Sequence, residues 1–229
     1  MGRRRRRAAR VSHLVDVAGA SVAAILTRAP SAGGKSRLFG ALGRPVDPAL
    51  LTALLLDTLD GAEVPGVSRM VAVEPAGACD EVRAIVPAGV QVLPQAAGTL
   101  GERMAALMGE LFGRGAGAVA LLGSDLPDLQ PRVISAAFDL LAREPDLLAI
   151  GPARDGGYYL IAATAVPDVF TGVDWGSDRV LAQTLAAAKA RNIRVRLLDR
   201  MRDVDTPADL HAANGRRTAA WRRAQLQGL

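Results

Sequence analysis

The chain is poor in aromatic side chains. Phenylalanine, tryptophan and tyrosine together make up only 3% of its 229 residues. Proteins that bind single-stranded nucleic acid stack the bases on aromatic side chains, so this composition argues against that class. Because half of the residues are nevertheless hydrophobic, we expect a sizeable core built mainly of leucine, valine, alanine and isoleucine.

Cysteine and histidine are also scarce. The single cysteine, Cys79, excludes a disulfide within the chain, and we expect it to be a small apolar core residue. A structural zinc site needs several cysteine or histidine ligands, and the only histidines are His13 and His211. Neither histidine has a neighbouring partner that would make it catalytic.

Long hydrophobic runs are absent from the sequence. The apolar run at residues 22–26 is too short to span a membrane and is better explained as a strand. The segment after the N-terminal arginines makes a poor export signal because Ser12, His13 and Asp16 interrupt it. We therefore expect a cytoplasmic protein without membrane contact.

The net charge of +5 originates in one short segment. Residues 3–7 are all arginine and carry five positive charges, so the rest of the chain is close to neutral. Such a basic arm could contact nucleic acid or an acidic surface, but short basic runs are weak motifs. We expect residues 1–20 to form a basic, disordered arm, and we expect no nucleic-acid partner.

After this arm, short apolar runs alternate with longer amphipathic stretches, which is typical of βα units and a mostly parallel sheet. The expected strands are residues 21–27, 68–73, 90–93, 118–122, 147–150, 157–162 and 193–198. The expected helices are residues 48–59, 80–86, 100–112, 131–143, 178–191 and 207–214, and residues 28–44 are expected to be a loop. The connection at 151–156 is too short for a helical crossover, so the strands on either side of it are not a standard βαβ pair.

The same pattern predicts a single α/β domain at residues 21–215, followed by a polar tail at 216–229. No internal repeat and no long linker divide it. A homodimer is compatible with the sequence, which shows no coiled-coil repeat. The residues with chemical potential follow the expected strand ends, where open α/β sheets bind their ligands.

A basic, glycine-rich loop follows the first expected strand. Gly34, Lys35 and Ser36 match the end of a phosphate-binding P-loop, but Ala29 stands where that motif has its first glycine. Backbone N–H groups, Lys35 and Arg37 are what a polyphosphate requires. The structural alternative is an ordinary glycine-rich surface loop with solvated charges.

Two acidic segments follow later strands. Asp125 stands directly after residues 118–122, where a carboxylate can bind Mg²⁺ together with phosphate oxygens; capping of the next helix is the alternative. Asp203 and Asp205 are two residues apart and share a face of an extended segment. Either they contact the same metal, or Asp205 or Thr206 simply caps the helix at residue 207.

Two further segments have both a structural and a functional interpretation. The glycine-rich segment at residues 151–159 contains Asp155 and could form the wall of an acceptor or sugar site, and it also fits a tight hairpin. Thr99 and Glu102 form the pattern of a capping box at a helix start. From the first turn of that helix, Arg103 could reach a phosphate.

Taken together, these segments resemble a family of GT-A-fold transferases, related to the radical-SAM/selenodomain-associated glycosyltransferase-like proteins. The resemblance covers roughly residues 21–212. It rests on Gly34-Lys35-Ser36-Arg37-Leu38, Leu100-Gly101-Glu102-Arg103, Gly123-Ser124-Asp125-Leu126-Pro127, Gly151-Pro152, Asp155-Gly156-Gly157-Tyr158-Tyr159, Trp175 and Asp203-Val204-Asp205-Thr206. The family is also similar to 2-phospholactate and phosphoenolpyruvate guanylyltransferases. The chain departs from the usual family loop at Gly33 and Ser36, neither of which removes a charge.

This resemblance implies a three-layer α/β/α sandwich of the nucleotide-diphospho-sugar transferase type. It also implies Mg²⁺, or Mn²⁺ in its place, with Asp125 as the main ligand and Asp205 as the second. Lys35, Arg37 and Asp125 would be the catalytic residues, with Lys35 and Arg37 neutralising the nucleotide phosphates. The expected substrate-binding residues are Thr27, Arg28, Gly34, Thr99, Gly101, Arg103, Ser124, Asp155, Gly156 and Gly157.

Three functions compete on this basis. The first is a nucleotidyltransferase that joins an NMP from an NTP to a small phosphorylated or carboxylated acceptor and releases pyrophosphate, chemistry that needs mostly positioning and charge. The second is a glycosyltransferase with a nucleotide-sugar donor; Ser124-Asp125-Leu126 lacks the Asp-x-Asp motif common to such enzymes. The third is a nucleotide-binding protein without catalysis, which the pairing of a cationic loop with acidic segments argues against.

Overall fold

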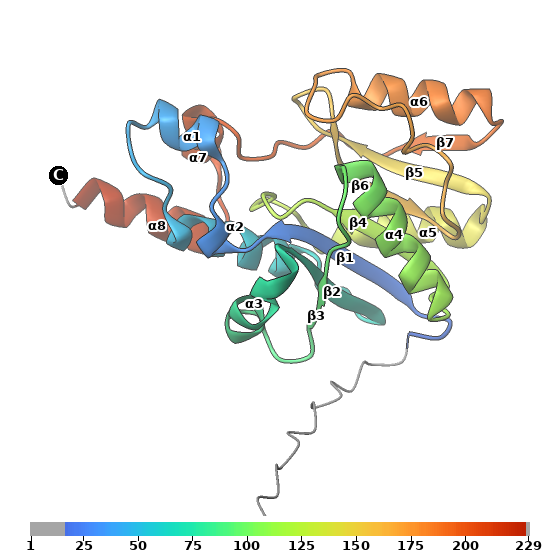
Figure 1. Ribbon diagram of the computed structural model, residues 1–229, viewed down its shortest axis with the longest axis horizontal. Coiled ribbons are helices and arrows are strands. Elements are labelled where there is room, and N and C mark those ends of the chain that lie inside the picture. The colour runs from blue at the N-terminus through green and yellow to red at the C-terminus, as the bar shows by residue number, and fades with distance from the viewer. Residues whose placement is uncertain (1–16, 228–229) are drawn as a thin grey trace, which may run out of the picture.

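The computed structural model describes residues 17–227 and contains a seven-stranded sheet in that part of the chain (Figure 1). Its strand order is β3-β2-β1-β4-β6-β5-β7. The strands are β1 (Ser21–Arg28), β2 (Val67–Glu74), β3 (Gln91–Pro94), β4 (Ala118–Leu122), β5 (Leu147–Pro152), β6 (Tyr158–Ala163) and β7 (Arg194–Leu197). Only β6 runs antiparallel to its neighbours β4 and β5, so the predicted mostly parallel α/β sheet is confirmed.

Eight α-helices connect or flank these strands in the described part of the chain. They are α1 (Ser36–Ala41), α2 (Pro48–Gly61), α3 (Cys79–Ile85), α4 (Leu100–Gly113), α5 (Pro131–Arg143), α6 (Val180–Ala190), α7 (Pro207–Ala212) and α8 (Arg216–Gln227). None of the described helices is long and apolar enough to cross a membrane.

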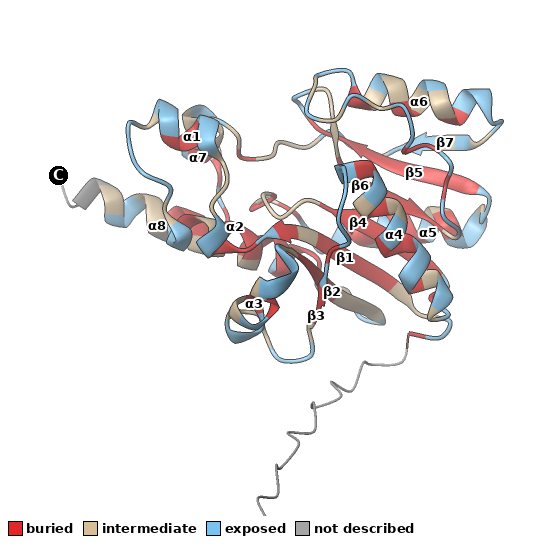
Figure 2. Ribbon diagram, in the orientation of Figure 1, coloured by how far each residue is buried: buried red, intermediate tan, exposed pale blue. Residues whose placement is uncertain are grey.

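The sheet is buried on both faces because its side chains alternate between two hydrophobic clusters. In β1, Ala23 and Ile25 pack with residues of α2, α3 and α5, whereas Val22 and Ala24 pack with residues of α4 and α6. The two-residue period of a strand produces this split, and the helices cover both faces as they do in α/β proteins. Most strands are accordingly buried, whereas the edge strand β7 and the outer helix faces are largely exposed (Figure 2).

A third, smaller cluster lies at one end of the molecule. Here α1, α7 and α8 gather beside α2, away from α6 and β7 (Figure 1). Leu38 and Phe39 of α1 pack with Val204 and with Leu210 of α7. This cluster holds the segments after β1 and β7 next to each other.

The expected elements are present with ends shifted by at most two residues, and β4 and α5 have the predicted bounds. The hairpin at the short 151–156 connection is also confirmed, since β5 and β6 are antiparallel. Two expectations need correction. Residues 28–44 are not wholly a loop, because they contain the 3-10 turn Pro30–Ala32 and helix α1. The polar tail after residue 216 is helical as far as Gln227.

Candidate functional site

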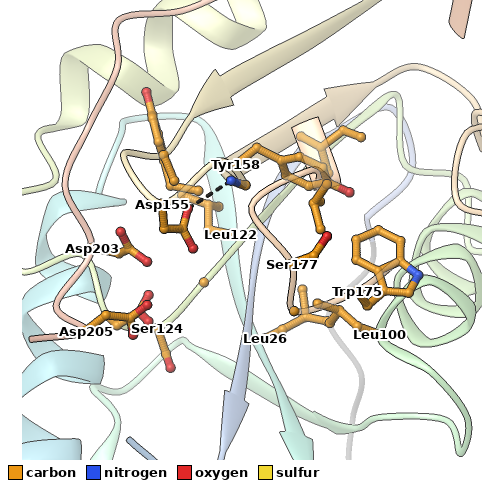
Figure 3. Close-up of a pocket in the computed structure, with 18 of the residues that line it drawn as sticks. Leu26, Leu100, Leu122, Ser124, Asp155, Tyr158, Trp175, Ser177, Asp203 and Asp205 are labelled. Carbon is orange, nitrogen blue, oxygen red and sulfur yellow. Dashed lines mark hydrogen bonds between the residues drawn. The ribbon is translucent and has the colours of Figure 1, made fainter. Parts of the chain in front are cut away.

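A cavity of about 810 Å³ lies at the edge of the sheet where β1, β4 and β5 end and β6 begins. Its two ends differ in character, as Figure 3 shows. Asp203, Asp205 and Ser124 lie at one end, whereas Leu100 and Trp175 lie at the other. The position agrees with the general rule that ligands bind outside the carboxyl ends of strands in open α/β sheets.

Lys35 stands at the start of α1 in an uncommon backbone conformation. Its φ of 51° and ψ of 38° place it in the left-handed region, which costs a residue with a Cβ about 1–2 kcal/mol. The ammonium group is paired with Asp125 and lies 2.5 Å from Asp205 Oδ1. Burial alone would lower the pKa of Lys35, but the charges of Asp125 and Asp205 raise it above its ordinary value. Lys35 is therefore held as a cation at this end of the cavity.

Three carboxylates come together beside Lys35: those of Asp125, Asp203 and Asp205, which we call the carboxylate cluster. One oxygen from each lies within 4.8 Å of the others. Burial, followed by the charges of Asp125, Asp155 and Asp205, raises the pKa of Asp203 to about 7. The cluster thus holds more negative charge than Lys35 alone neutralises.

Two hydrogen bonds hold the acidic segments in place. Val204 N–H donates to the carbonyl of Asp125 at 3.1 Å, which joins the segment after β7 to the segment after β4. Leu126 N–H donates to Thr58 Oγ1 at 3.0 Å, and Thr58 is fully buried in α2. Val204 is buried as well, so the residues on either side of it point the other way, into the cavity.

Helix capping does not account for either acidic residue. Thr206 caps α7: its hydroxyl accepts from Asp209 N–H, and Asp209 in turn accepts from Thr206 N–H at 2.9 Å. At α5 the N-cap position belongs to Gln130, whose side chain makes no capping bond. Asp125 and Asp205 are therefore available for a ligand.

The turn between β5 and β6 closes the expected hairpin and also borders the large cavity. Asp155 Oδ1 accepts from Gly157 N–H at 2.9 Å, and both residues line the cavity (Figure 3). Gly156 has a φ of +92°, and a Cβ there would lie 2.0 Å from the carbonyl oxygen of Asp178. Gly156 is thus required by the close approach of the turn to the segment before α6, and it does not itself line the cavity.

The opposite end of the cavity is bounded by Tyr158 and Trp175, which we call the aromatic wall. Their rings make an edge-to-face contact with centroids 6.3 Å apart. A Cβ on Gly101 would lie 2.7 Å from the Trp175 ring, so this glycine lets the indole approach α4 closely. Gly101, expected to bind substrate, therefore acts through Trp175.

The remaining expected residues separate into two groups. Arg37 and Ser124 line the large cavity. Thr27, Arg28 and Gly34 instead line a smaller cavity of about 130 Å³, which also borders Lys35, Ser124 and Asp125. The two cavities therefore adjoin the same ion pair.

Thr99 and Arg103 have structural contacts. Thr99 and Glu102 form the expected capping box of α4. Arg103 donates to Glu74 at 2.6 Å and to Gln95 at 3.0 Å, and neither Thr99 nor Arg103 is among the described residues that line the two cavities. In this structure Arg103 holds α4 against β2 and the segment after β3, and its expected contact with a phosphate stays a prediction.

Several lining residues were not singled out by the sequence analysis as site residues. Asp203 was considered only together with Asp205, as a contact to the same metal, and neither Tyr158 nor Trp175 was assigned a role of its own. The apolar floor, to which Leu26, Leu121 and Ile161 contribute, carries no sequence signal beyond that of an ordinary core strand.

The carboxylate cluster has the donor chemistry for a divalent cation. Mg²⁺ prefers carboxylate oxygens supplemented by phosphate oxygens and water. Burial is the main cause of the raised pKa of Asp203, and the charges of Asp125, Asp155 and Asp205 add to it. A cation among the carboxylates would offset the repulsion between them. Asp125, Asp203 and Asp205 are thus the described residues that can hold such an ion.

Solved structures with the same architecture include several transferases. A crystal structure from Desulfovibrio desulfuricans G20, described as a "putative nucleotide-diphospho-sugar transferase", has a TM-score of 0.80 and 28% identity, covering 91% of this chain and 96% of that one. A CMP:2-keto-3-deoxy-manno-octonic acid synthetase complexed with CTP has a TM-score of 0.56 and 17% identity, covering 90% of this chain and 100% of that one. A 4-diphosphocytidyl-2C-methyl-D-erythritol synthase from Anaerococcus prevotii DSM 20548 has a TM-score of 0.54 and 13% identity, covering 86% and 95%. The last two likenesses bear on the fold alone, and they agree with the expected nucleotide-diphospho-sugar transferase architecture.

A comparison with curated proteins finds no match. A family model does match, over residues 58–177, and its description is "Uncharacterized protein conserved in bacteria (DUF2064)". That segment includes β4, Asp125, the β5–β6 turn and Trp175. The chain therefore belongs to the DUF2064 family, whose matched segment supplies two thirds of the residues that line the large cavity.

Proposed function

We propose that this protein is a Mg²⁺-dependent nucleotidyltransferase, which transfers an NMP group from an NTP to a small acceptor and releases pyrophosphate. One observation carries the proposal: Lys35 and the carboxylate cluster meet at one end of a cavity large enough for a nucleotide and an acceptor. A cation beside a set of metal-binding carboxylates is what a triphosphate and its metal ion require.

The chemistry needs charge and position more than proton transfer. The acceptor oxygen attacks the α-phosphorus, the bond from that phosphorus to the bridging oxygen breaks, and pyrophosphate leaves with the electron pair. Lys35 and Arg37 would neutralise the phosphate oxygens that gain negative charge. Asp125 and Asp205, with Asp203, would hold Mg²⁺, which supplies further neutralisation of the phosphates when bound.

The solved structures support transfer of a nucleotide-containing group in general terms. The Desulfovibrio protein is described as a nucleotide-diphospho-sugar enzyme, and the synthetase was crystallised with CTP. A fold of this kind hosts more than one chemistry, so the choice between nucleotidyl and glycosyl transfer rests on the site. Lys35 and Arg37, as cations for a leaving pyrophosphate, favour nucleotidyl transfer over transfer from a nucleotide sugar.

The first experiment is thermal unfolding of the purified protein with individual NTPs and nucleotide sugars, each with and without Mg²⁺. A ligand present at about 100 times its Kd adds about 2.7 kcal/mol to the free energy of unfolding. We expect Mg²⁺-dependent stabilisation by one NTP and a smaller effect from nucleotide sugars. Preference for a nucleotide sugar would contradict nucleotidyl transfer and identify a glycosyltransferase.

A variant separates Mg²⁺-dependent nucleotide binding from nucleotide binding that does not need the metal. Asp205→Asn removes one charge from the carboxylate cluster and leaves the capping box of α7 intact, because Thr206 and Asp209 form it. We expect this variant to lose the part of the stabilisation that depends on Mg²⁺. If the variant kept that part in full, the proposed metal site would be wrong.

A further inference from the structure

We propose that the aromatic wall binds the uncharged, apolar part of the acceptor, so that the acceptor is a hydroxyl compound rather than a phosphate or a carboxylate. The inference rests on the proposed nucleotidyl transfer and defines its second substrate. It differs from the phosphorylated or carboxylated acceptor that the sequence led us to expect.

The balance of charge around the large cavity argues against an anionic acceptor. Among the described residues, five aspartates line it, against two basic side chains, Lys35 and Arg37. Lys35 is already paired with Asp125 and Asp205. The phosphates of the nucleotide would take up Lys35, Arg37 and any bound metal ion, so no lining cation is left over for a second anion. An unpaired anion in a partly buried site is costly.

The aromatic end of the cavity offers apolar surface instead. Tyr158 and Trp175 stand at right angles to each other, with an interplanar angle of 83°, and Leu100 and Met104 of α4 lie on the same cavity. Figure 3 shows the Trp175 ring next to Leu100 and away from Asp203 and Asp205. Such a pocket stabilises an apolar body by removing its surface from water.

The smaller cavity leaves the aromatic wall free for the acceptor. It borders Lys35 and Asp125 as the large one does, and it is bounded by Gly33, Gly34 and the end of β1. The glycines allow a ligand to approach the backbone closely. At about 130 Å³ it can hold part of a nucleotide whose phosphates contact Lys35, and neither Tyr158 nor Trp175 is among the described residues that line it.

A hydroxyl acceptor brings a proton that a phosphate does not. When its oxygen bonds to the α-phosphorus and pyrophosphate departs, that proton must pass to a base. Asp155 is a lining carboxylate between the two ends, and the hydrogen bond from Gly157 N–H fixes its orientation. The Asp155 carboxylate takes the proton and then releases it to water.

Trp175 makes the proposal measurable without an activity assay. The chain has two tryptophans, and the other, Trp221 on α8, donates to Asp47 at 2.8 Å outside both cavities. In a Trp221→Phe variant, tryptophan fluorescence reports on Trp175 alone. The probes are 2-phenylethanol and 1-hexanol, each compared with its phosphate ester, on protein saturated with Mg²⁺ and the NTP identified by thermal unfolding.

We expect both alcohols to change the Trp175 fluorescence and to bind about tenfold more tightly than their phosphate esters, a difference of about 1.4 kcal/mol. Calorimetry should show that binding of the alcohols is lost in Trp175→Ala and largely kept in Trp175→Phe. Leu197→Ala, an exposed position on β7 outside the cavity, should bind like the unaltered chain.

Three results would overturn the inference. Tighter binding of the phosphate esters would show that the acceptor is anionic. A change in Trp175 fluorescence on addition of the NTP alone would assign the aromatic wall to the nucleoside. No response to either alcohol would show that the wall is not an acceptor site. In all three cases Mg²⁺-dependent stabilisation by the NTP would still stand, so the proposed function and this inference fail separately.

Discussion

The two ends of the large cavity are built by opposite means. The carboxylate cluster and Lys35 come from three loops far apart in the sequence, and Lys35 has a strained backbone. The aromatic wall is packed against the helix α4 and carries no charge. The first end has more negative charge than Lys35 neutralises and is suited to cations and phosphates. The second end consists of side chains packed closely against one another and is suited to recognition. Under the proposed function, chemistry and recognition lie at separate places in one cavity.

The largest expected effect is at the end of the cavity that holds Lys35 and the carboxylate cluster, which we call the charged end. Asp125→Asn removes the charge that pairs with Lys35 and that would hold the metal ion. We expect nucleotidyl transfer to fall by a factor on the order of 10²–10³, the usual effect of removing one electrostatic contact from a transition state. Steady-state kinetics with a coupled pyrophosphate assay would measure it.

Asp128→Asn is a matched control for that substitution. Asp128 lies three residues further on and accepts from Asn214 N–H at 2.8 Å, outside both cavities. An asparagine can still accept this bond, so turnover should stay close to that of the unaltered chain. Equal losses in the two variants would mean that Asp125 acts through the fold of its loop and not through its charge.

The next largest effect is at the turn that joins the two ends. In Gly156→Ala the new Cβ would lie 2.0 Å from the carbonyl oxygen of Asp178. Backbone must move at a position that already has a positive φ, so we expect the free energy of unfolding to fall by about 3 kcal/mol. Gly176→Ala has a similar φ of +90° but no atom within 4 Å of the Cβ, and it should cost only about 1 kcal/mol. Urea unfolding would measure both variants. Equal losses in the free energy of unfolding would show that the backbone at Asp178 moves away from the new Cβ with little loss of stability.

The charged end should also make stability depend on pH. The pKa of Asp203 is raised to about 7 by burial and by Asp125, Asp155 and Asp205. The folded protein therefore binds this proton more tightly than the unfolded chain does. Its stabilising effect is complete below pH 4 and is lost as the pH rises through 7. We expect a loss of about 1–2 kcal/mol between pH 4 and 8 in metal-free protein, because solvent screens part of the repulsion.

Asp203→Asn should remove that pH dependence, and Mg²⁺ at pH 8 should restore stability to the unaltered chain. Thermal unfolding across the pH range would measure both. The aromatic wall contributes no such dependence in this range, because burial raises the pKa of Tyr158 above its ordinary value. A pH profile unchanged by Asp203→Asn would contradict the repulsion within the carboxylate cluster.

The features that the sequence predicted correctly depend on signals within a few neighbouring residues. β4 has its predicted bounds because an apolar run ends at a glycine, and α5 because Pro131 suits a first helical position. The capping box of Thr99 and Glu102 follows from a spacing of three residues. The order of strands and helices could be read in the same way, since each unit is amphipathic by itself.

The features that the sequence did not predict depend on contacts between distant parts of the chain. Helix α8 is rich in arginine and glutamine, and its apolar residues were not enough to predict it. Its start is held by Asp57 of α2, which accepts from the N–H groups of Arg217 and Thr218. Helix α1 was not predicted, because the glycines and the proline around it are typical of a loop. Lys35 and Asp205 are separated by 170 residues, and nothing in either segment indicates that the lysine pairs with both aspartates.

The smallest effect we expect distinguishes the two roles that the sequence left open for the segment after β7. Thr206→Ala removes the hydroxyl that accepts from Asp209 N–H and should lower the free energy of unfolding by about 1 kcal/mol. It should leave Mg²⁺-dependent stabilisation by the NTP unchanged. Asp205→Asn should instead leave the free energy of unfolding unchanged and remove the Mg²⁺-dependent stabilisation. Urea unfolding and thermal unfolding with the NTP would measure the two properties separately. If Asp205→Asn instead weakened the fold and spared the Mg²⁺ effect, Asp205 would belong to the helix rather than to the charged end, and the contrast between the two ends would rest on Asp125 and Asp203 alone.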